Sequence, residues 1–145
     1  IPVINTKKKS TGKVIKHLTE RGIKVNVTAI MTIEQLKKVI KNLNPKVPSC
    51  ISIFAGRIAD TGRDPVQVMT TALKLMKKNK NSELIWASTR ELYNIYQANN
   101  IKCDIITVTT DVLNKFNLLN YNLNKYSLDT VKGFRNDAIK SKFRI

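Results

Sequence analysis

Arginine and hydroxyl side chains stand directly after two short apolar runs of this sequence. Arg57 follows the run from Cys50 to Phe54, and Ser88 and Arg90 follow the run from Glu83 to Ala87. A guanidinium group grips phosphate or carboxylate through parallel hydrogen bonds, and the backbone N–H groups that begin a helix also favour an anion. These residues therefore predict a phosphate site, provided that the two loops lie side by side.

A simpler interpretation of the same loop stays open. Ser88 and Glu91 have the spacing of a capping box, so Ser88 could do no more than begin a helix. Arg90 could pair with Glu83 or Glu91 at the surface. In that case the loop would carry no ligand.

A second polar set lies inside the apolar runs themselves. Asn26 and Thr28 are two residues apart, as are Ser52 and Phe54, so each pair points to one side of its strand. A buried amide or hydroxyl without a partner costs about 1 kcal/mol or more. Asn26, Thr28 and Ser52 on neighbouring strands therefore predict a shared polar site, although core polar groups that satisfy one another would give the same pattern.

Alternating strands and helices must position these groups. Asp64-Pro65 has the residue types that begin a helix, and Thr32 with Gln35 forms a capping box. We expect strands at 1–4, 24–30, 50–54, 83–87 and 104–108, and helices at 11–21, 32–43, 65–78, 88–98, from 111, and 127–141. Arg57 is placed on the loop between the third strand and its helix. Continuous apolar strands separated by helices predict a parallel α/β sheet with right-handed crossovers, whose carboxyl ends carry the binding groups.

Length and composition limit the function classes. With 145 residues, 42% of them apolar, the chain can form one domain with its own core. No apolar run approaches the length of a membrane-spanning helix. Cys50 and Cys103 are expected to be free thiols, and His17, the only histidine, has no ligand partner nearby. We therefore expect no metal and no cofactor.

The strong positive charge has two interpretations. A formal net charge of +16, from 26 basic and 10 acidic residues, is typical of a nucleic-acid-binding module. Most of the basic residues are lysines spread over the predicted helices, which favours an ordinary solvated surface. No zinc-finger spacing or aromatic RNA-binding motif is present. A nucleic-acid partner is therefore disfavoured, and it is kept as the alternative from another function class.

Five motifs, taken in order, resemble the transaldolase family, class I (Schiff-base) enzymes on a (β/α)8 TIM barrel. I-P-V-I-N-T-K is similar to the end of the family's fourth strand and V-N-V-T-A-I-M-T to its fifth. S-I-F-A-G-R-I-A-D, W-A-S-T-R and C-D-I-I-T-V-T-T-D-V-L are similar to the sixth, seventh and eighth. The resemblance implies that residues 1–145 are a single partial TIM-barrel domain, from the end of strand four through strand eight and the C-terminal helix.

The resemblance also implies a role for each candidate residue. Thr28 matches the threonine that positions the catalytic water, and Phe54 stands where transaldolases carry phenylalanine and the related aldolases carry tyrosine. The resemblance also implies two substrate-binding groups. Asn26 and Ser52 contact the hydroxyl groups of the sugar, and the phosphate is held by Arg57, Ser88 and Arg90. The Schiff-base lysine of the family would immediately precede Ile1. We expect this chain to be the C-terminal part of a longer enzyme and to be inactive by itself.

The implied reaction is the transfer of a three-carbon dihydroxyacetone unit between sugar phosphates through a lysine Schiff base. The resemblance places this reaction in carbohydrate metabolism of the pentose phosphate type. A fructose-6-phosphate aldolase of the same family is the nearest alternative activity. We further expect a sugar-phosphate substrate, no cofactor and no membrane association. We also expect a cytoplasmic location and, for the complete protein, a homo-oligomer.

Overall fold

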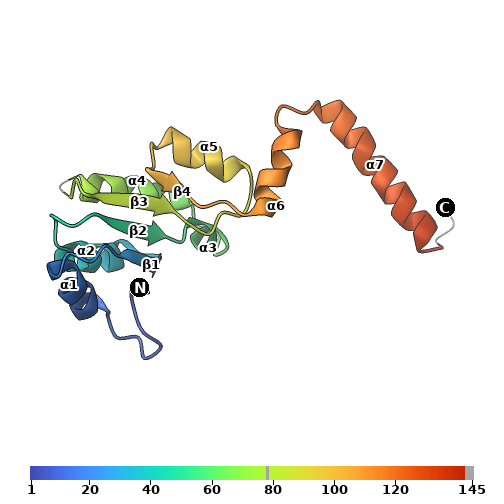
Figure 1. Ribbon diagram of the computed structural model, residues 1–145. Coiled ribbons are helices and arrows are strands. Elements are labelled where there is room, and N and C mark those ends of the chain that lie inside the picture. The colour runs from blue at the N-terminus through green and yellow to red at the C-terminus, as the bar shows by residue number, and fades with distance from the viewer. Residues whose placement is uncertain (78, 143–145) are drawn as a thin grey trace. The chain divides into compact units, whose positions relative to one another are not determined.

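A computed structural model describes residues 1–77 and 79–142 of the chain (Figure 1). The chain forms two compact units, Ile1–Leu113 and Asn114–Ile145. In the described part no helix is long and apolar enough to cross a membrane.

The first unit is built on a parallel sheet of four strands in the order β1-β2-β3-β4 (Figure 1). These strands are β1 (Asn26–Ile30), β2 (Ser49–Ile53), β3 (Ser82–Trp86) and β4 (Ile105–Ile106). The segment at the start of the chain runs parallel to β1, because Pro2 forms a bridge with Thr28 and the amide of Val3 donates to the carbonyl oxygen of Thr28 at 2.9 Å. The predicted parallel α/β sheet is confirmed.

Two of the expected helix starts are confirmed in detail. At α2 (Ile33–Asn42) the Thr32 side chain accepts from the amide of Gln35, and the Gln35 side chain accepts in return from the amide of Thr32. At α4 (Pro65–Met76) the Asp64 side chain accepts from the amide of Val66 at 2.9 Å. Each cap satisfies amides that the first helical turn leaves without an intrahelical partner.

The remaining helices of this unit are α1 (Gly12–Glu20), α3 (Ala55–Ala59), α5 (Tyr93–Asn100) and α6 (Thr110–Leu113). The predicted loop position of Arg57 is wrong, because Arg57 lies inside the short helix α3. The start of α5 is a second correction. Ser88 does not cap it, since Ser88 has a left-handed backbone (φ 65°) and the helix begins five residues later, at Tyr93.

The last strand is shorter than expected, covering two residues of the predicted span 104–108. The carboxylate of Asp104 accepts from the amide of Leu84 at 2.8 Å, which takes a donor on β3 away from the ladder. The amide of Thr107 still donates to the carbonyl oxygen of Trp86 at 3.0 Å, so the chain continues alongside β3 beyond β4.

The core lies between one face of the sheet and the helices. Val27, Ile51, Ile53, Leu84 and Trp86 alternate along β1, β2 and β3 and are fully buried in one cluster. Their alternation follows from the two-residue period of a strand. Buried residues of α2 and α4, such as Leu36 and Met69, complete this cluster.

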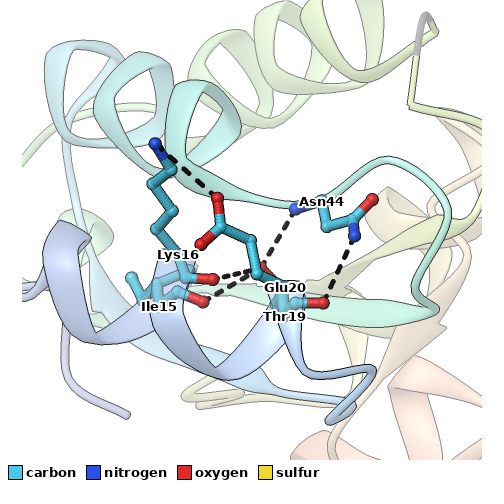
Figure 2. Close-up of polar contacts among 5 residues, drawn as sticks. All are labelled: Ile15, Lys16, Thr19, Glu20 and Asn44. Carbon is cyan, nitrogen blue, oxygen red and sulfur yellow. Dashed lines mark hydrogen bonds and ion pairs between the residues drawn. The ribbon is translucent and has the colours of Figure 1, made fainter.

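A buried threonine joins α1 to the loop that follows α2 (Figure 2). The Thr19 hydroxyl donates to the carbonyl oxygen of Ile15 at 3.0 Å and accepts from the amide of Asn44 at 3.1 Å. The Asn44 side chain donates to the carbonyl oxygen of Thr19. Lys16 and Glu20 form an exposed ion pair beside them, at 3.6 Å.

The second unit consists of the 3-10 helix η1 (Asn114–Leu118) and helix α7 (Leu123–Lys140). Helix α7 begins four residues before the predicted start at Ser127. The side chain of Asn122 accepts from the amide of Lys125 at 3.0 Å and so caps the helix at this earlier position. The predicted end, at Ser141, agrees with the C-cap.

Candidate functional site

The loop after β3 borders a hollow of about 260 Å³. This hollow lies at the carboxyl ends of β3 and β4, and hydroxyl groups and one arginine line it. Its lining residues are Ser88, Thr89, Arg90, Thr107, Val108 and Thr109. Parallel sheets of α/β proteins place their ligands at this end of the strands. Hydroxyl donors beside a guanidinium group are suited to the oxygens of an anion.

Hydrogen bonds hold this loop on both sides. The Thr89 hydroxyl, which is buried, donates to the carbonyl oxygen of Thr107 at 2.6 Å. The side-chain oxygen of Asn94, on α5, accepts from the amides of Arg90 at 2.9 Å and Glu91 at 3.2 Å. The loop is therefore fixed to the segment after β4 and to α5, and Asn94 replaces the cap predicted at Ser88.

Helix α3 is pressed against the same loop at Gly56. The amide of Gly56 donates to the carbonyl oxygen of Ala87 at 3.4 Å. A Cβ atom on Gly56 would lie 1.6 Å from the carbonyl oxygen of Ser88 and 3.0 Å from the Cγ of Arg90. Only a glycine allows this approach, so the loops after β2 and β3, which carry Arg57 and Arg90, are packed directly together.

The guanidinium group of Arg90 is bound by Asp60, the residue that ends α3. Its Nη2 donates to the Oδ2 of Asp60 at 2.6 Å, and about half of each side chain is exposed, 52% and 51%. The pairing with Glu83 or Glu91 considered above is replaced by this ion pair. It uses one of the five N–H donors of the guanidinium group, and within residues 1–77 and 79–142 no second acceptor binds the group, so its other donors are open to a ligand.

Arg57 extends toward a neighbouring hollow. Its guanidinium carbon lies 5.4 Å from the centre of the Phe54 ring, within cation–π range. With Met31 and Thr32, among others, it lines a hollow of about 390 Å³. Arg57 and Arg90 thus stand on two joined segments but border different hollows.

Two members of the second polar set meet on the sheet. The Ser52 hydroxyl donates to the side-chain oxygen of Asn26 at 2.8 Å, and Ser52 is buried whereas Asn26 is exposed. Asn26 begins β1, and it also lines a hollow of about 380 Å³ with Cys50 and Glu83 at the amino ends of the strands. This placement brings Asn26 to Ser52 but not to the hollow beside Arg90.

Thr28 lies next to an irregularity of β1. Its amide donates to the carbonyl oxygen of Ile1 at 2.8 Å, and the register with β2 shifts between Val27 and Ile30. Ala29 adopts a left-handed backbone (φ 60°) within this shift. Such bulges redirect side chains and are frequent beside binding sites.

A family model described as Transaldolase/Fructose-6-phosphate aldolase matches residues 1–145. The chain belongs to this family. It is 30% identical over 104 residues to a probable transaldolase of Methanococcus maripaludis (strain C7 / ATCC BAA-1331), and this alignment covers 71% of this chain and 46% of that protein. It is also 29% identical over 119 residues to a probable transaldolase of Nitrosopumilus maritimus (strain SCM1), covering 81% and 51%. The chain spans about half the length of the curated relatives it matches.

Membership of the transaldolase family explains the sheet. Four parallel strands in sequential order, with helices between them, correspond to part of a (β/α)8 barrel. The face of the sheet opposite the helices carries Asn26, Cys50 and Glu83 side by side in register. Asn26 and Glu83 are exposed there.

Three residues of this candidate site were not predicted: Asp60, Asn94 and Gly56 as a packing contact. Asp60 follows Gly56 by four residues, which is the spacing of one face of a helix. That spacing in S-I-F-A-G-R-I-A-D was the available signal, and it is informative only once residues 55–59 are known to be helical. Asn94 gave no signal of its own, because an asparagine inside a predicted helix has many roles.

The two thiols are poor nucleophiles at neutral pH. Burial raises the pKa of Cys50, and nearby Glu83 raises it further. Burial also raises the pKa of Cys103, whose thiol contacts the carbonyl oxygens of Leu84 and Ile105. In residues 1–77 and 79–142, no group of three or more His, Cys, Asp or Glu side chains could hold a metal ion.

Proposed function

We propose that this chain binds the phosphate group of a sugar phosphate at the hollow bordered by Ser88 and Arg90. The observation that carries the proposal is the position of Arg90, held at a hydroxyl-lined hollow at the carboxyl ends of β3 and β4. Arg57, on the adjoining helix α3, lines the neighbouring hollow and adds a second positive charge near the site. Membership of the transaldolase family supports a sugar phosphate over other anions.

The reaction proposed for the complete protein is the transfer of a dihydroxyacetone unit. A lysine amine attacks the carbonyl carbon of a ketose phosphate and forms an imine with loss of water. Cleavage of the adjacent carbon–carbon bond releases an aldose phosphate and leaves a three-carbon enamine, because the imine accepts the electron pair of the broken bond. The enamine carbon then attacks the aldehyde of an acceptor sugar phosphate, and hydrolysis of the new imine releases the product.

The side chains of this chain take supporting roles in that proposal. Thr28 positions the water that hydrolyses the imine, while Asn26 and Ser52 contact hydroxyl groups of the sugar. The hydrogen bond between Asn26 and Ser52 supports placing these two residues at one part of the substrate. Phe54 favours the transaldolase activity over the aldolase activity. The pathway (pentose phosphate type), the cytoplasmic location and a homo-oligomeric state are proposed on the family resemblance alone.

The position of the lysine gives the covalent test. We place the Schiff-base lysine immediately before Ile1, so residues 1–145 alone should form no stable adduct when treated with borohydride and fructose 6-phosphate. A protein that includes the preceding lysine should be trapped at that lysine, as read by mass spectrometry of its peptides. An adduct on Lys7, Lys8, Lys9 or Lys13 would contradict the assignment.

A separate assay distinguishes the two activities of the family. A transaldolase needs an acceptor aldose phosphate to turn over fructose 6-phosphate, whereas an aldolase releases dihydroxyacetone without one. We expect turnover of the complete protein to depend on the acceptor, because Phe54 occupies the discriminating position. Release of dihydroxyacetone at the same rate without an acceptor would favour the aldolase.

A further inference from the structure

We propose that Asp60 is a positioning residue that orients the guanidinium group of Arg90 for a phosphate. The inference rests on the proposed sugar-phosphate site and adds to it a residue that does not touch the ligand. Its basis is the hydrogen bond of 2.6 Å between Arg90 Nη2 and Asp60 Oδ2, which joins helix α3 to the loop after β3.

The contact holds an otherwise mobile side chain. Arg90 is about half exposed, and a free arginine samples many rotamers that a ligand must suppress on binding. The amide of Arg90 is bound by Asn94, and its guanidinium group is bound by Asp60. Both ends of the residue are therefore fixed before any ligand arrives, and a phosphate meets donors that are already in place.

Helix α3 holds Asp60 itself in position. The amide of Asp60 donates to the carbonyl oxygen of Gly56 at 2.9 Å, one helical turn earlier. Gly56 in turn is in contact with the backbone of Ser88. The carboxylate is thus fixed relative to the same loop that carries Arg90, which is the arrangement that a positioning residue requires.

An ordinary surface ion pair predicts a different result from a positioning residue. A half-exposed pair contributes little to stability, so stability alone gives no reason for this contact. A carboxylate beside an anion site also repels the anion. Removal of a carboxylate without a positioning role would therefore leave phosphate binding unchanged or make it tighter. Removal of a positioning residue would make it weaker, against the direction of the charge change.

The experiment measures the dissociation constant of fructose 6-phosphate by calorimetry or amide chemical shifts, with the full chain and four variants. We expect Arg90→Ala to weaken binding at least about tenfold, as for loss of a charge-assisted hydrogen bond. Asp60→Ala should weaken it by about 3- to 10-fold, the range set by the ordering of one flexible side chain. Asp60→Asn, which keeps an acceptor oxygen, should stay within about twofold of the parent.

The matched control is Glu20→Ala on α1. Glu20 also forms an exposed ion pair, with Lys16, and its removal changes the net charge by the same amount (Figure 2). This variant should bind fructose 6-phosphate as the parent does. If Arg90→Ala weakens binding but Asp60→Ala binds as well as or better than the parent, Asp60 is not a positioning residue. If Arg90→Ala itself binds normally, the proposed phosphate site is wrong.

Discussion

Replacement of Gly56 by alanine tests whether helix α3 and the loop after β3 form one packed unit. The added Cβ atom would lie 1.6 Å from the carbonyl oxygen of Ser88, far inside any observed contact distance. The two segments must separate by at least about 1.4 Å to bring this contact to 3.0 Å. Backbone lies on both sides of the contact, so no side-chain rotation relieves it.

The expected cost follows from this overlap. Overpacking a tight site costs about 1–3 kcal/mol, and a collision between two backbone segments belongs at the upper end, about 3 kcal/mol. For a unit of this size the melting temperature should fall by roughly 10 °C or more. Trp86, the only tryptophan and fully buried in the core, reports the unfolding of this unit by fluorescence. Binding of fructose 6-phosphate should weaken as well, because Arg90 moves relative to α3.

Gly133 provides the matched control, since it lies inside α7 and an added Cβ would meet no atom within 4 Å beyond the adjacent backbone of that helix. Gly133→Ala should strengthen the helix by about 0.5–1 kcal/mol and leave the Trp86 transition unchanged. A Gly56→Ala protein that unfolds within about 1 kcal/mol of the parent would refute the close packing of α3 on Ser88.

Four further predictions concern Arg57, Asp64, the two cysteines and the net charge. Arg57→Ala in the complete enzyme should raise KM for phosphorylated substrates by the equivalent of about 1–3 kcal/mol, and an unchanged KM would remove Arg57 from the site. Asp64→Ala should lower the free energy of unfolding by about 1 kcal/mol in urea titrations, and no loss would show that the cap of α4 is dispensable. Burial raises the pKa of Cys50 and Cys103, so their contribution to stability is complete below the ordinary thiol pKa of about 8.5 and is lost as pH rises through the folded-state values. In urea titrations, the free energy of unfolding should fall less between pH 7.5 and 10 for the double serine variant than for the parent protein. An equal fall in the two proteins would contradict the burial of these thiols. Retention on a DNA column should disappear at modest salt, whereas retention at high salt would favour a nucleic-acid-binding module.

The sheet could be predicted because each strand is a short apolar run with a clear start and end. Helix starts were predicted correctly at Thr32 and Asp64, whose side chains cap the helices that follow them, but the cap at Asn122 was missed. The capping-box prediction failed at Ser88. Ser88 and Glu91 have the spacing of a capping box, but the Asn94 side chain, inside the helix, accepts from the amides of Arg90 and Glu91. A capping pattern in sequence does not show which of two acceptors takes the amides.

The site was predictable in its residue types and less so in its geometry. A shared polar site was predicted for Asn26, Thr28 and Ser52, and of these Asn26 and Ser52 share a hydrogen bond. The pairing of Arg90 with Asp60 joins residues 30 positions apart, and it depends on a helix after β2 and on the contact of Gly56 with Ser88. No local pattern contains that information, because it arises from the packing of two loops.

The central claim is that a sugar phosphate binds at the hollow lined by the loop after β3 and the segment after β4, beside helix α3. The most direct measurement is a two-dimensional amide spectrum of the full chain, titrated with fructose 6-phosphate and in parallel with fructose. We predict that fructose 6-phosphate, and not fructose at the same concentration, shifts the amides of residues 56–58, 88–90 and 107–109 in a saturable manner. Shifts confined to the lysine-rich helices α1 and α2, or equal shifts with fructose, would contradict the claim.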